Sequence, residues 1–259
     1  MKTVAELHAQ YGPELRRDLD VLLADLCGRS VAFIHAHGEW EVDDARLDAW
    51  LRRRIAGEPL QYIRGRADFY GRELLVDDRV LIPRPETELL VEEAIQRLPR
   101  GARVLDVGTG SGCVSVTLAL ERPDLRMFAV DLSPAALAVA RRNRERLGAH
   151  VRFAASDVLD SLRGRFDAIV SNPPYIAAGE LPSLQVEVRD HEPRMALTPG
   201  SLGTEVIERL FAAPLVLMEI GFGQEGAVRA IAQGRGYRVD AVIPDLAAIP
   251  RVVVSSPAL

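Results

Sequence analysis

Apolar residues recur at intervals of three and four in the first part of the chain, as they do on the buried face of an amphipathic helix. Two such stretches run from Leu15 to Leu23 and from Asp44 to Leu51. They predict a small helical bundle as a first domain, over residues 1–67. Residues 68–82 contain two short β-prone runs around Asp77-Asp78, and these predict a β-hairpin linker with its turn at the two aspartates.

From residue 83 the pattern changes to alternating strand-like and helix-like segments, after Pro83-Arg84-Pro85 opens a new helix. The expected strands are Val104–Val107, Met127–Val130, Val151–Ala154, Phe166–Val170, Leu215–Ile220, Tyr237–Val242 and Arg251–Val254, and the expected helices include Gly112–Leu120, Ala135–Leu147 and Gln224–Gln233. A further helix is expected through Phe211–Ala213, directly before Pro214. Repeated β-α-β units predict a parallel sheet with helices on both faces. We therefore expect an α/β, Rossmann-like, seven-stranded domain over residues 83–259.

Composition and charge are typical of a globular protein. The chain has 259 residues, of which 48% are hydrophobic, enough for a catalytic domain with a smaller partner domain. Its 32 Lys and Arg against 37 Asp and Glu give a net charge of -5, which disfavours nucleic-acid binding through a broad basic face. Two cysteines, Cys27 and Cys113, form neither a disulfide framework nor a metal cluster. With no secretory or transit signal and no apolar run of membrane-spanning length, we expect a cytoplasmic protein without membrane partners.

A glycine-rich loop follows the first strand of the second domain, in the sequence Val104-Leu105-Asp106-Val107-Gly108-Thr109-Gly110-Ser111-Gly112. Glycines let the backbone turn tightly and approach a ligand without Cβ clashes. The dinucleotide fingerprint G-x-G-x-x-G would place its third glycine at position 113, so the register disfavours a nicotinamide enzyme. We interpret Gly108–Gly112 as a cofactor loop; a purely structural turn is the alternative.

Carboxylates at the ends of the next two strands extend this candidate site. Asp131 ends the second strand and is placed to accept both ribose hydroxyls of a nucleoside cofactor, although it could instead cap the helix that begins near Ser133. Asp157 follows the third strand and could accept an adenine amino group. Val158, beside it, would add a backbone or apolar contact.

The fourth strand ends in Ser171-Asn172-Pro173-Pro174-Tyr175, the most informative segment of the sequence. A conjugated nitrogen is a poor nucleophile, so a site that methylates it must accept its N–H hydrogens, orient it and stabilise developing positive charge. The Asn172 side-chain oxygen and the Pro173 carbonyl can accept those hydrogens. Two consecutive prolines, Pro173 and Pro174, stiffen the backbone, and Tyr175 offers a ring face for stacking on a planar amide. A rigid strand-ending turn is the structural alternative.

Taken together, these segments closely resemble the protein-(glutamine-N5) methyltransferases that act on peptide chain release factors, known as the HemK or PrmC family. The resemblance spans nearly the whole chain. The Asn-Pro-Pro-Tyr element alone is shared with adenine-N6 and other amino-group methyltransferases. The pieces that narrow the match are Gly57–Ile63, Leu81–Glu88 (LIPRPETE), Asp106–Gly112, Ser171–Ile176 and Glu219-Ile220-Gly221.

The resemblance implies transfer of a methyl group from S-adenosylmethionine to the glutamine side chain in the Gly-Gly-Gln loop of release factors 1 and 2, with S-adenosylhomocysteine as the product. It implies that Gly108–Gly112 and Asp131 hold the cofactor and that Asn172 touches both ligands. Pro173, Pro174 and Tyr175 would clamp the glutamine. The N-terminal helical domain would help to recognise the protein substrate.

Two other groups of residues have simpler interpretations. His35 and His37 alone do not make a metal site, which needs three or four ligands, so we expect no metal. The arginine runs Arg52–Arg54 and Arg141-Arg142-Asn143-Arg144 are typical of solvated helix faces, with contact to an acidic release factor as an alternative for the first.

Three functions of different classes remain open from the sequence: a protein-glutamine methyltransferase, an adenine-N6-type methyltransferase acting on nucleic acid, and a catalytically silent cofactor-binding module. Action on nucleic acid should require a basic groove or a recognition domain, and the sequence shows neither in obvious form. A silent module should have lost its acceptors, whereas Asn172 and Tyr175 are present. The first function is therefore favoured.

Overall fold

The computed structural model describes residues 1–42 and 45–258, and its chain divides into two compact units, Met1–Gly65 and a second that begins at Arg66. The helix expected from Asp44 begins at Ala45 within the described residues, and Asp44 itself lies outside them. No helix in the described part of the chain is both long and apolar enough to cross a bilayer.

The first unit is the expected helical bundle. Its helices are α1 (Val4–Cys27), α2 (Val31–Ala36), α3 (Ala45–Ile55) and α4 (Leu60–Arg64), and β1 (Lys2–Thr3) pairs with β2 (Glu41–Val42). Helix α1 starts at a capping box in which the Thr3 hydroxyl accepts from the Glu6 N–H, and it bends at Gly12-Pro13, where Gly12 has a non-helical φ of 66°. The core gathers the apolar stripes of these helices, among them Leu19, Leu22, Leu23, Ile34, Leu47, Leu51 and Ile63.

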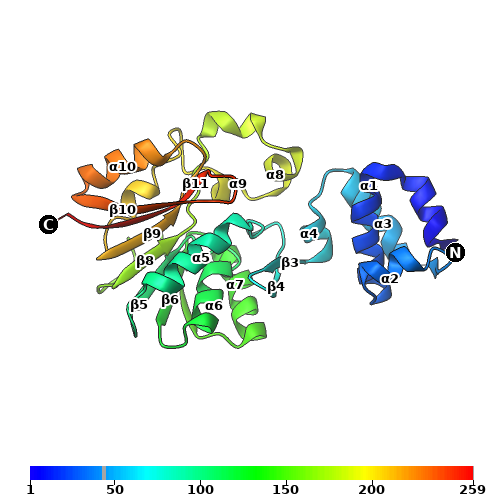
Figure 1. Cartoon of the computed structure of the whole chain (residues 1–259), viewed down its shortest axis with the longest axis horizontal. Helices are drawn as coiled ribbons and strands as arrows, with labels where there is room; N and C mark the ends of the chain where they lie inside the picture. Colours follow the sequence, from blue (N-terminus) through cyan, green and yellow to red (C-terminus); the bar gives the residue numbers. More distant parts are fainter. Residues whose placement is uncertain (43–44, 259) are drawn as a thin grey trace. The chain divides into compact units, whose positions relative to one another are not determined.

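The second unit contains a seven-stranded sheet in the order β10-β11-β9-β8-β5-β6-β7 (Figure 1). Its strands are β5 (Arg103–Val107), β6 (Arg126–Asp131), β7 (Val151–Ala155), β8 (Ala168–Ser171), β9 (Leu215–Glu219), β10 (Tyr237–Pro244) and β11 (Pro250–Pro257). Its longer helices are α5 (Glu86–Arg97), α6 (Cys113–Glu121), α7 (Pro134–Leu147) and α10 (Glu225–Gly234), and the short ones are α8 (Val186–His191), α9 (Arg194–Leu197) and the 3-10 turns η1 (Ala178–Ser183) and η2 (Ile207–Arg209). The predicted seven-stranded α/β fold class is confirmed.

Alternate strand residues bury opposite faces of this sheet, as the period of two requires. Val104 and Val170 belong to the core beneath α5 and α6, whereas Leu105 and Ile169 belong to the core that includes Val228 of α10 and the η2 turn. Both faces are therefore covered, and the loops that carry polar side chains project from the strand ends.

The sheet is not entirely parallel, which corrects the expectation of a parallel sheet. Strand β11 runs antiparallel to both β9 and β10. The physical reason is the short connection between β10 and β11, because two strands joined by a few residues form a hairpin, whereas a parallel pair needs a long crossover.

The hairpin before the sheet has its turn at a different place from the one expected. Strands β3 (Arg66–Phe69) and β4 (Arg72–Leu75) pair around Tyr70-Gly71, not around Asp77-Asp78. Tyr70 and Gly71 have φ values of 49° and 68°, which suits a two-residue turn whose central residues both need positive φ. Asp77 instead receives the guanidinium of Arg79 in a two-point ion pair.

The helix expected through Phe211–Ala213 is also absent from the structure, where only the 3-10 turn η2 precedes β9. Pro214 disfavours the helical conformation in the residue before it, and Phe211 packs instead against the ring of Tyr237. The expectation of a helix over Phe211–Ala213 is therefore wrong, because an apolar run before a proline also fits a packed loop.

Candidate active site

The register of the parallel strands brings three predicted segments to one edge of the sheet. Val107 at the end of β5 pairs with Val130 of β6 and with Ser171 of β8. The residues that follow are the glycine loop, Asp131 and Asn172. Strand order and register therefore place the glycine loop, Asp131 and Asn172 at one edge, because the carboxyl ends of parallel strands meet at the same edge of a sheet.

The glycine loop turns back tightly after β5. Gly108 and Thr109 both donate their N–H groups to the Val130 carbonyl, at 2.9 and 3.0 Å. Gly108, Gly110 and Gly112 have φ values of 72°, 54° and 83°, a region in which side chains other than glycine are strained. A Cβ at Gly112 would lie 3.2 Å from Val116 and 3.3 Å from Ala140, so this glycine also permits close packing of α6 against α7.

Asp131 is tied to the glycine loop through backbone hydrogen bonds. Its Oδ2 accepts the Gly110 N–H at 2.9 Å and its Oδ1 accepts the Ser133 N–H at 2.8 Å. Burial raises the pKa of Asp131, and these backbone donors partly offset that effect. Ser133, not Asp131, caps α7 by accepting the Ala136 N–H at 3.1 Å. Each carboxylate oxygen has a second lone pair, so Asp131 can still accept hydroxyl groups from a ligand.

Asp157 and Val158 lie just beyond the end of β7. The Asp157 carboxylate accepts a hydrogen bond from Arg209 at 2.7 Å and is about half exposed. Val158 is buried and has a φ of 50°, so its backbone takes a conformation that is unusual for a β-branched residue. Arg209 is a neighbour of this corner that the sequence did not indicate.

A cavity of about 380 Å³ opens at this edge, and we call it the sheet-edge cavity. Its size lies in the range of small-molecule sites. Of the predicted cofactor residues, Gly108, Gly110, Asp131, Asp157, Val158 and Asn172 line it, together with Pro174. Thr109 and Ser111 line a smaller adjoining pocket, and the Thr109 hydroxyl hydrogen-bonds Asp106 at 2.6 Å. Thr109 and Ser111 therefore do not line the sheet-edge cavity itself.

Asn172 is held by a buried polar network that begins at α5 and ends on Tyr175. The Asn172 amide nitrogen donates to the Thr87 hydroxyl at 2.9 Å, and the Thr87 hydroxyl donates to Glu219 at 2.7 Å. The Tyr175 hydroxyl donates to the other Glu219 oxygen at 3.3 Å. Thr87 and Glu219 are each 1% exposed. In the sequence both residues lie within motifs, LIPRPETE and Glu219-Ile220-Gly221, and nothing there indicated a role for either.

Burial dominates the electrostatics of this network. It raises the pKa of Glu219 to about 7, against the opposing effect of hydrogen bonds from Thr87 and Tyr175. Burial also raises the pKa of Tyr175 above its ordinary value, and the neighbouring Glu219 charge adds to the effect. In the glycine loop, burial raises the pKa of Asp106 to about 6, partly offset by hydrogen bonds from Thr109 and Ser115.

Backbone contacts fix the remaining part of the Asn172–Tyr175 segment. The Ser171 hydroxyl donates to the Val107 carbonyl at 2.7 Å, and Gln224 donates to the Tyr175 carbonyl at 2.8 Å. Pro173 is buried. Pro173 and Tyr175 do not line the sheet-edge cavity, whereas Asn172 and Pro174 do.

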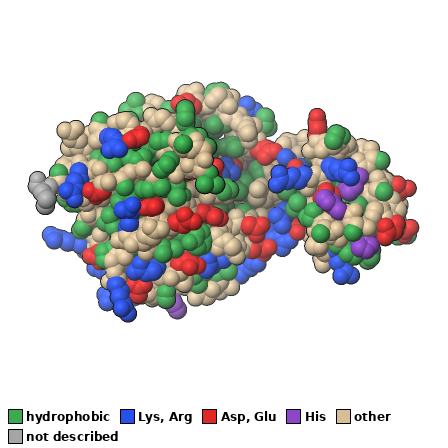
Figure 2. All heavy atoms as spheres, in the orientation of Figure 1, with side chains coloured by type: hydrophobic (Ala, Val, Ile, Leu, Met, Phe, Trp, Pro, Cys, Tyr) green, Lys and Arg blue, Asp and Glu red, His purple; other side chains and the backbone are tan. Residues whose placement is uncertain are grey.

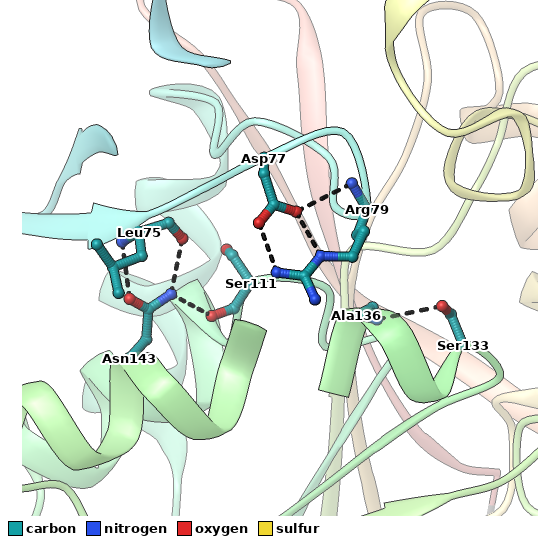
Figure 3. Close-up of polar contacts among 7 residues, drawn as sticks. All are labelled: Leu75, Asp77, Arg79, Ser111, Ser133, Ala136 and Asn143. Carbon is teal, nitrogen blue, oxygen red and sulfur yellow. Dashed lines mark hydrogen bonds and ion pairs between the residues drawn. The ribbon is translucent and has the colours of Figure 1, made fainter. Parts of the chain in front are cut away.

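Asn143 is a further residue that the sequence did not indicate, because it lies in an arginine-rich run interpreted as a solvated helix face. It is fully buried on α7, whereas Arg141 and Arg142 are exposed. Figure 3 shows its amide reaching both backbone groups of Leu75, at 2.7 and 2.9 Å, and the Ser111 carbonyl, at 2.9 Å. It thus links the glycine loop to strand β4. The 3.6-residue period of α7, which places residue 143 on the same face as Val139 and Ala140, was the signal available.

The chemistry available at this edge is that of binding and orientation. The described residues contain no cluster of three or more histidine, cysteine or acidic side chains arranged for a metal ion. What the site offers is a cavity with a carboxylate, beside an amide whose nitrogen donates one hydrogen to Thr87 and whose oxygen can accept a hydrogen from a ligand. Such a pair can place a small donor molecule next to a planar N–H group.

Comparisons with known proteins match each of the two parts of the chain to a protein family. Residues 85–239 match the family described as methyltransferase small domain, and residues 1–65 match the PrmC N-terminal domain. Over 257 residues the chain is 45% identical to a protein of Koribacter versatilis named release factor glutamine methyltransferase, covering 93% of this chain and 90% of that protein. The protein of that name from Escherichia coli K12 is 39% identical over 250 residues, covering 91% and 89%.

Solved structures agree on the fold. A methyltransferase from Pyrococcus furiosus superimposes with a TM-score of 0.52 and 19% identity, over 82% of this chain and all of that one. At this identity the likeness shows the fold alone.

Proposed function

Because the chain belongs to the family of release factor glutamine methyltransferases, S-adenosylmethionine-dependent enzymes, we propose that it methylates the N5 atom of the glutamine in the Gly-Gly-Gln motif of release factors 1 and 2. The resemblance stated from the sequence is thereby confirmed at the level of the family. The observation that carries the proposed chemistry is the orientation of Asn172, whose amide nitrogen is bound to Thr87 at the rim of the sheet-edge cavity.

We assign the sheet-edge cavity to S-adenosylmethionine, which supplies an electrophilic methyl group when bound. Its 380 Å³ and its mixed lining suit a nucleoside with an amino-acid tail. Asp131 would accept the ribose hydroxyls, and the backbone of Gly108–Gly112 would lie against the ligand. Asp157 and Val158 would contact the adenine, with Asp157 sharing its carboxylate between the ligand and Arg209.

The Asn172–Tyr175 segment is assigned to the substrate glutamine. The Asn172 side-chain oxygen and the Pro173 carbonyl would accept the two amide hydrogens, so that the nitrogen presents its lone pair to the methyl group. Pro174 and Tyr175 would clamp the planar amide. As the N–CH₃ bond forms and the methyl–sulfur bond of the donor breaks, one of the two hydrogens would leave as a proton to water, and these acceptors would stabilise the positive charge that develops before it leaves.

Orientation should supply most of the rate enhancement. Fixing a nucleophile and a methyl group in line contributes roughly 7 to 11 kcal/mol, whereas cation-π attraction from an aromatic ring adds about 0.5 to 2 kcal/mol. Asn172 and the two prolines contribute to the in-line orientation, and the Tyr175 ring contributes the smaller cation-π attraction. The transfer needs no metal and no covalent intermediate.

The proposal extends to partners and location. The helical unit would help to bind the release factor. On the face seen in Figure 2, acidic and basic side chains are interspersed, which supports a protein substrate over nucleic acid. The alternative, an adenine-N6-type activity on nucleic acid, rests on the Asn-Pro-Pro-Tyr element, which other amino-group methyltransferases share. We place the reaction in the cytoplasm because release factors act on the ribosome.

The test is methyl transfer from labelled S-adenosylmethionine to each candidate substrate. Unmodified release factors 1 and 2 should each become labelled, and the variant with Ala in place of the Gly-Gly-Gln glutamine should not. Single-stranded and duplex DNA serve as the competing substrates. Label on DNA, with none on either release factor, would overturn the assignment.

A further inference from the structure

We propose that Thr87 and Glu219 are positioning residues that fix the direction of the Asn172 amide, so that its oxygen and not its nitrogen faces the substrate glutamine. The inference rests on the proposed function and assigns a role to two residues that do not line the sheet-edge cavity. It also gives a physical reason for two sequence motifs, LIPRPETE and Glu219-Ile220-Gly221, that the proposed function leaves unexplained.

The direction of the amide follows from the number of hydrogens in the network. An ionised Glu219 carboxylate can only accept, so the single hydroxyl hydrogen of Thr87 points to it, across 2.7 Å. Thr87 is then only an acceptor toward Asn172, and the group that meets it at 2.9 Å must be the donating Nδ2. The Asn172 oxygen is left on the opposite side, where a glutamine N–H can reach it.

The same carboxylate also orients the aromatic ring of the substrate segment. Its second oxygen accepts the Tyr175 hydroxyl at 3.3 Å, while Gln224 holds the Tyr175 carbonyl at 2.8 Å. Glu219 therefore joins the amide acceptor and the clamping ring through one group. Because Glu219 is 1% exposed, water cannot replace these partners without opening the core.

Protonation of Glu219 would remove the directional constraint. A protonated carboxyl can donate to Thr87, whose own hydrogen is then free to point at Asn172 and to favour a flipped amide. The charged and titratable groups near Glu219 are Arg251 on β11, Glu86 on α5, Tyr175, and Cys113 on α6, whose thiol is close enough to feel the Glu219 charge. Arg251 favours the ionised form and Glu86 opposes it, while burial raises the pKa of Glu219 to about 7. Turnover should therefore fall as the pH drops through about 7.

The first experiment compares Thr87→Val with Thr87→Ser, using a release factor and labelled S-adenosylmethionine. Valine keeps the shape but removes the hydroxyl, so kcat should fall by about 10- to 100-fold, the range for losing a hydrogen bond that involves a charged group. Serine restores the hydroxyl and should restore most of the rate. Binding of S-adenosylhomocysteine, measured by calorimetry, should stay the same in both variants.

Thr117→Val is the matched control for this pair. Thr117 is also a fully buried threonine on a helix of the second unit, and its hydroxyl has no hydrogen-bond partner among the described residues. The substitution changes the same atoms without touching the network, so kcat should equal that of the wild type. A Thr87→Val enzyme as active as Thr117→Val would overturn the inference.

The second experiment measures the pH dependence of kcat for the wild type and for Glu219→Gln. Glutamine cannot titrate, so the fall of kcat on the acid side of about pH 7 should disappear, and the plateau should be lower by about 10-fold because the amide no longer enforces one direction. Thr87→Ser should keep the wild-type profile. An unchanged acid limb in Glu219→Gln would contradict the role assigned to Glu219, even if the Thr87→Val variant failed to fold.

Failure of this inference is distinguishable from failure of the proposed function. If the wild type does not label the Gly-Gly-Gln glutamine, the proposed function is wrong and the network has no substrate to serve. If the wild type labels it and the variants at positions 87 and 219 match the wild type in rate and pH profile, only the positioning role is wrong.

Discussion

The sheet-edge cavity and the Asn172–Tyr175 segment adjoin each other, yet they are held by different kinds of contact. On the side of the glycine loop the cavity is held by backbone groups, through Gly108 and through the Gly110 N–H that reaches Asp131, 21 residues away. Asn172 is held by side chains from distant segments, since Thr87 lies 85 residues from Asn172 and 132 residues from Glu219. The glycine loop and Asp131 are therefore held by contacts over short sequence separations, whereas Asn172 is held by contacts over long ones.

This difference separates binding from orientation. Backbone contacts at a strand end tolerate changes in neighbouring side chains, and they suit a cofactor pocket that must only bind. A buried side-chain network gives one defined direction to an amide, which is what a reacting nitrogen requires. We therefore expect changes in the cavity to affect cofactor affinity and changes in the network to affect the rate.

The largest effect is expected from Asn172→Ala. It removes the oriented acceptor, and kcat should fall by about 100- to 1,000-fold, as when one preorganised hydrogen-bonding group is removed from an active site. Affinity for S-adenosylhomocysteine should fall far less, because Asn172 is one of many residues that line the cavity. Single-turnover transfer with labelled cofactor and calorimetric binding measure the two quantities separately.

Circular dichroism and the unfolding midpoint check that the Asn172→Ala variant is folded. Near-normal turnover in a folded variant would refute the role of Asn172 and would remove the distinction between the two halves of the site.

A smaller effect, on affinity and not on rate, is expected from Asp131→Asn. In the wild type, the Gly110 and Ser133 N–H groups each donate to one oxygen of Asp131. The asparagine side chain has only one acceptor oxygen, so its NH₂ group would face one of these two N–H donors and lose that hydrogen bond. Affinity for S-adenosylmethionine should fall by about 10- to 100-fold, the range for hydrogen bonds to a charged group. At saturating cofactor, kcat should be close to that of the wild type.

Asp124→Asn is the control for Asp131. The Asp124 carboxylate also accepts a backbone N–H, from Gly101 at 2.9 Å, but it does not line the cavity. Its substitution should leave cofactor affinity unchanged. If Asp131→Asn lowered kcat at saturation and left affinity intact, the division between a binding half and an orienting half would be wrong.

The difference between short-range contacts at the glycine loop and long-range contacts at Asn172 explains how much of the site could be predicted from the sequence. Gly108, Asp131 and Asn172 each follow a clear strand, and strand order brings them to one edge, as expected. Their roles toward ligands stay predictions that these experiments test. Thr87 and Glu219 gave no chemical signal, because a threonine in a first helical turn and an acid at a strand end are common, and the contact between them depends on packing across 132 residues.

Errors in the fold prediction have equally local causes. Asp77-Asp78 has the composition of a turn, yet the backbone turns at Tyr70-Gly71, where a tyrosine with positive φ is not a usual signal. The apolar run Phe211–Ala213 fits a helix and a buried loop equally well, and Pro214 decided between them. The burial of Asn143 was not predicted, because the arginines on either side of it are typical of an exposed helix face.

The smallest effect is expected from Gly112→Ala compared with Gly148→Ala. Both glycines have positive φ, 83° and 70°, so each alanine costs about 1 to 2 kcal/mol of stability from backbone strain. A Cβ at Gly148 meets nothing within 4 Å, whereas one at Gly112 crowds Val116 and Ala140. Gly112→Ala should therefore lower the free energy of unfolding by about 1 kcal/mol more than Gly148→Ala does, as measured by urea titration. Equal losses would mean that α6 and α7 can separate freely, and the glycine loop would then owe its shape to φ alone and not to close packing of the backbone.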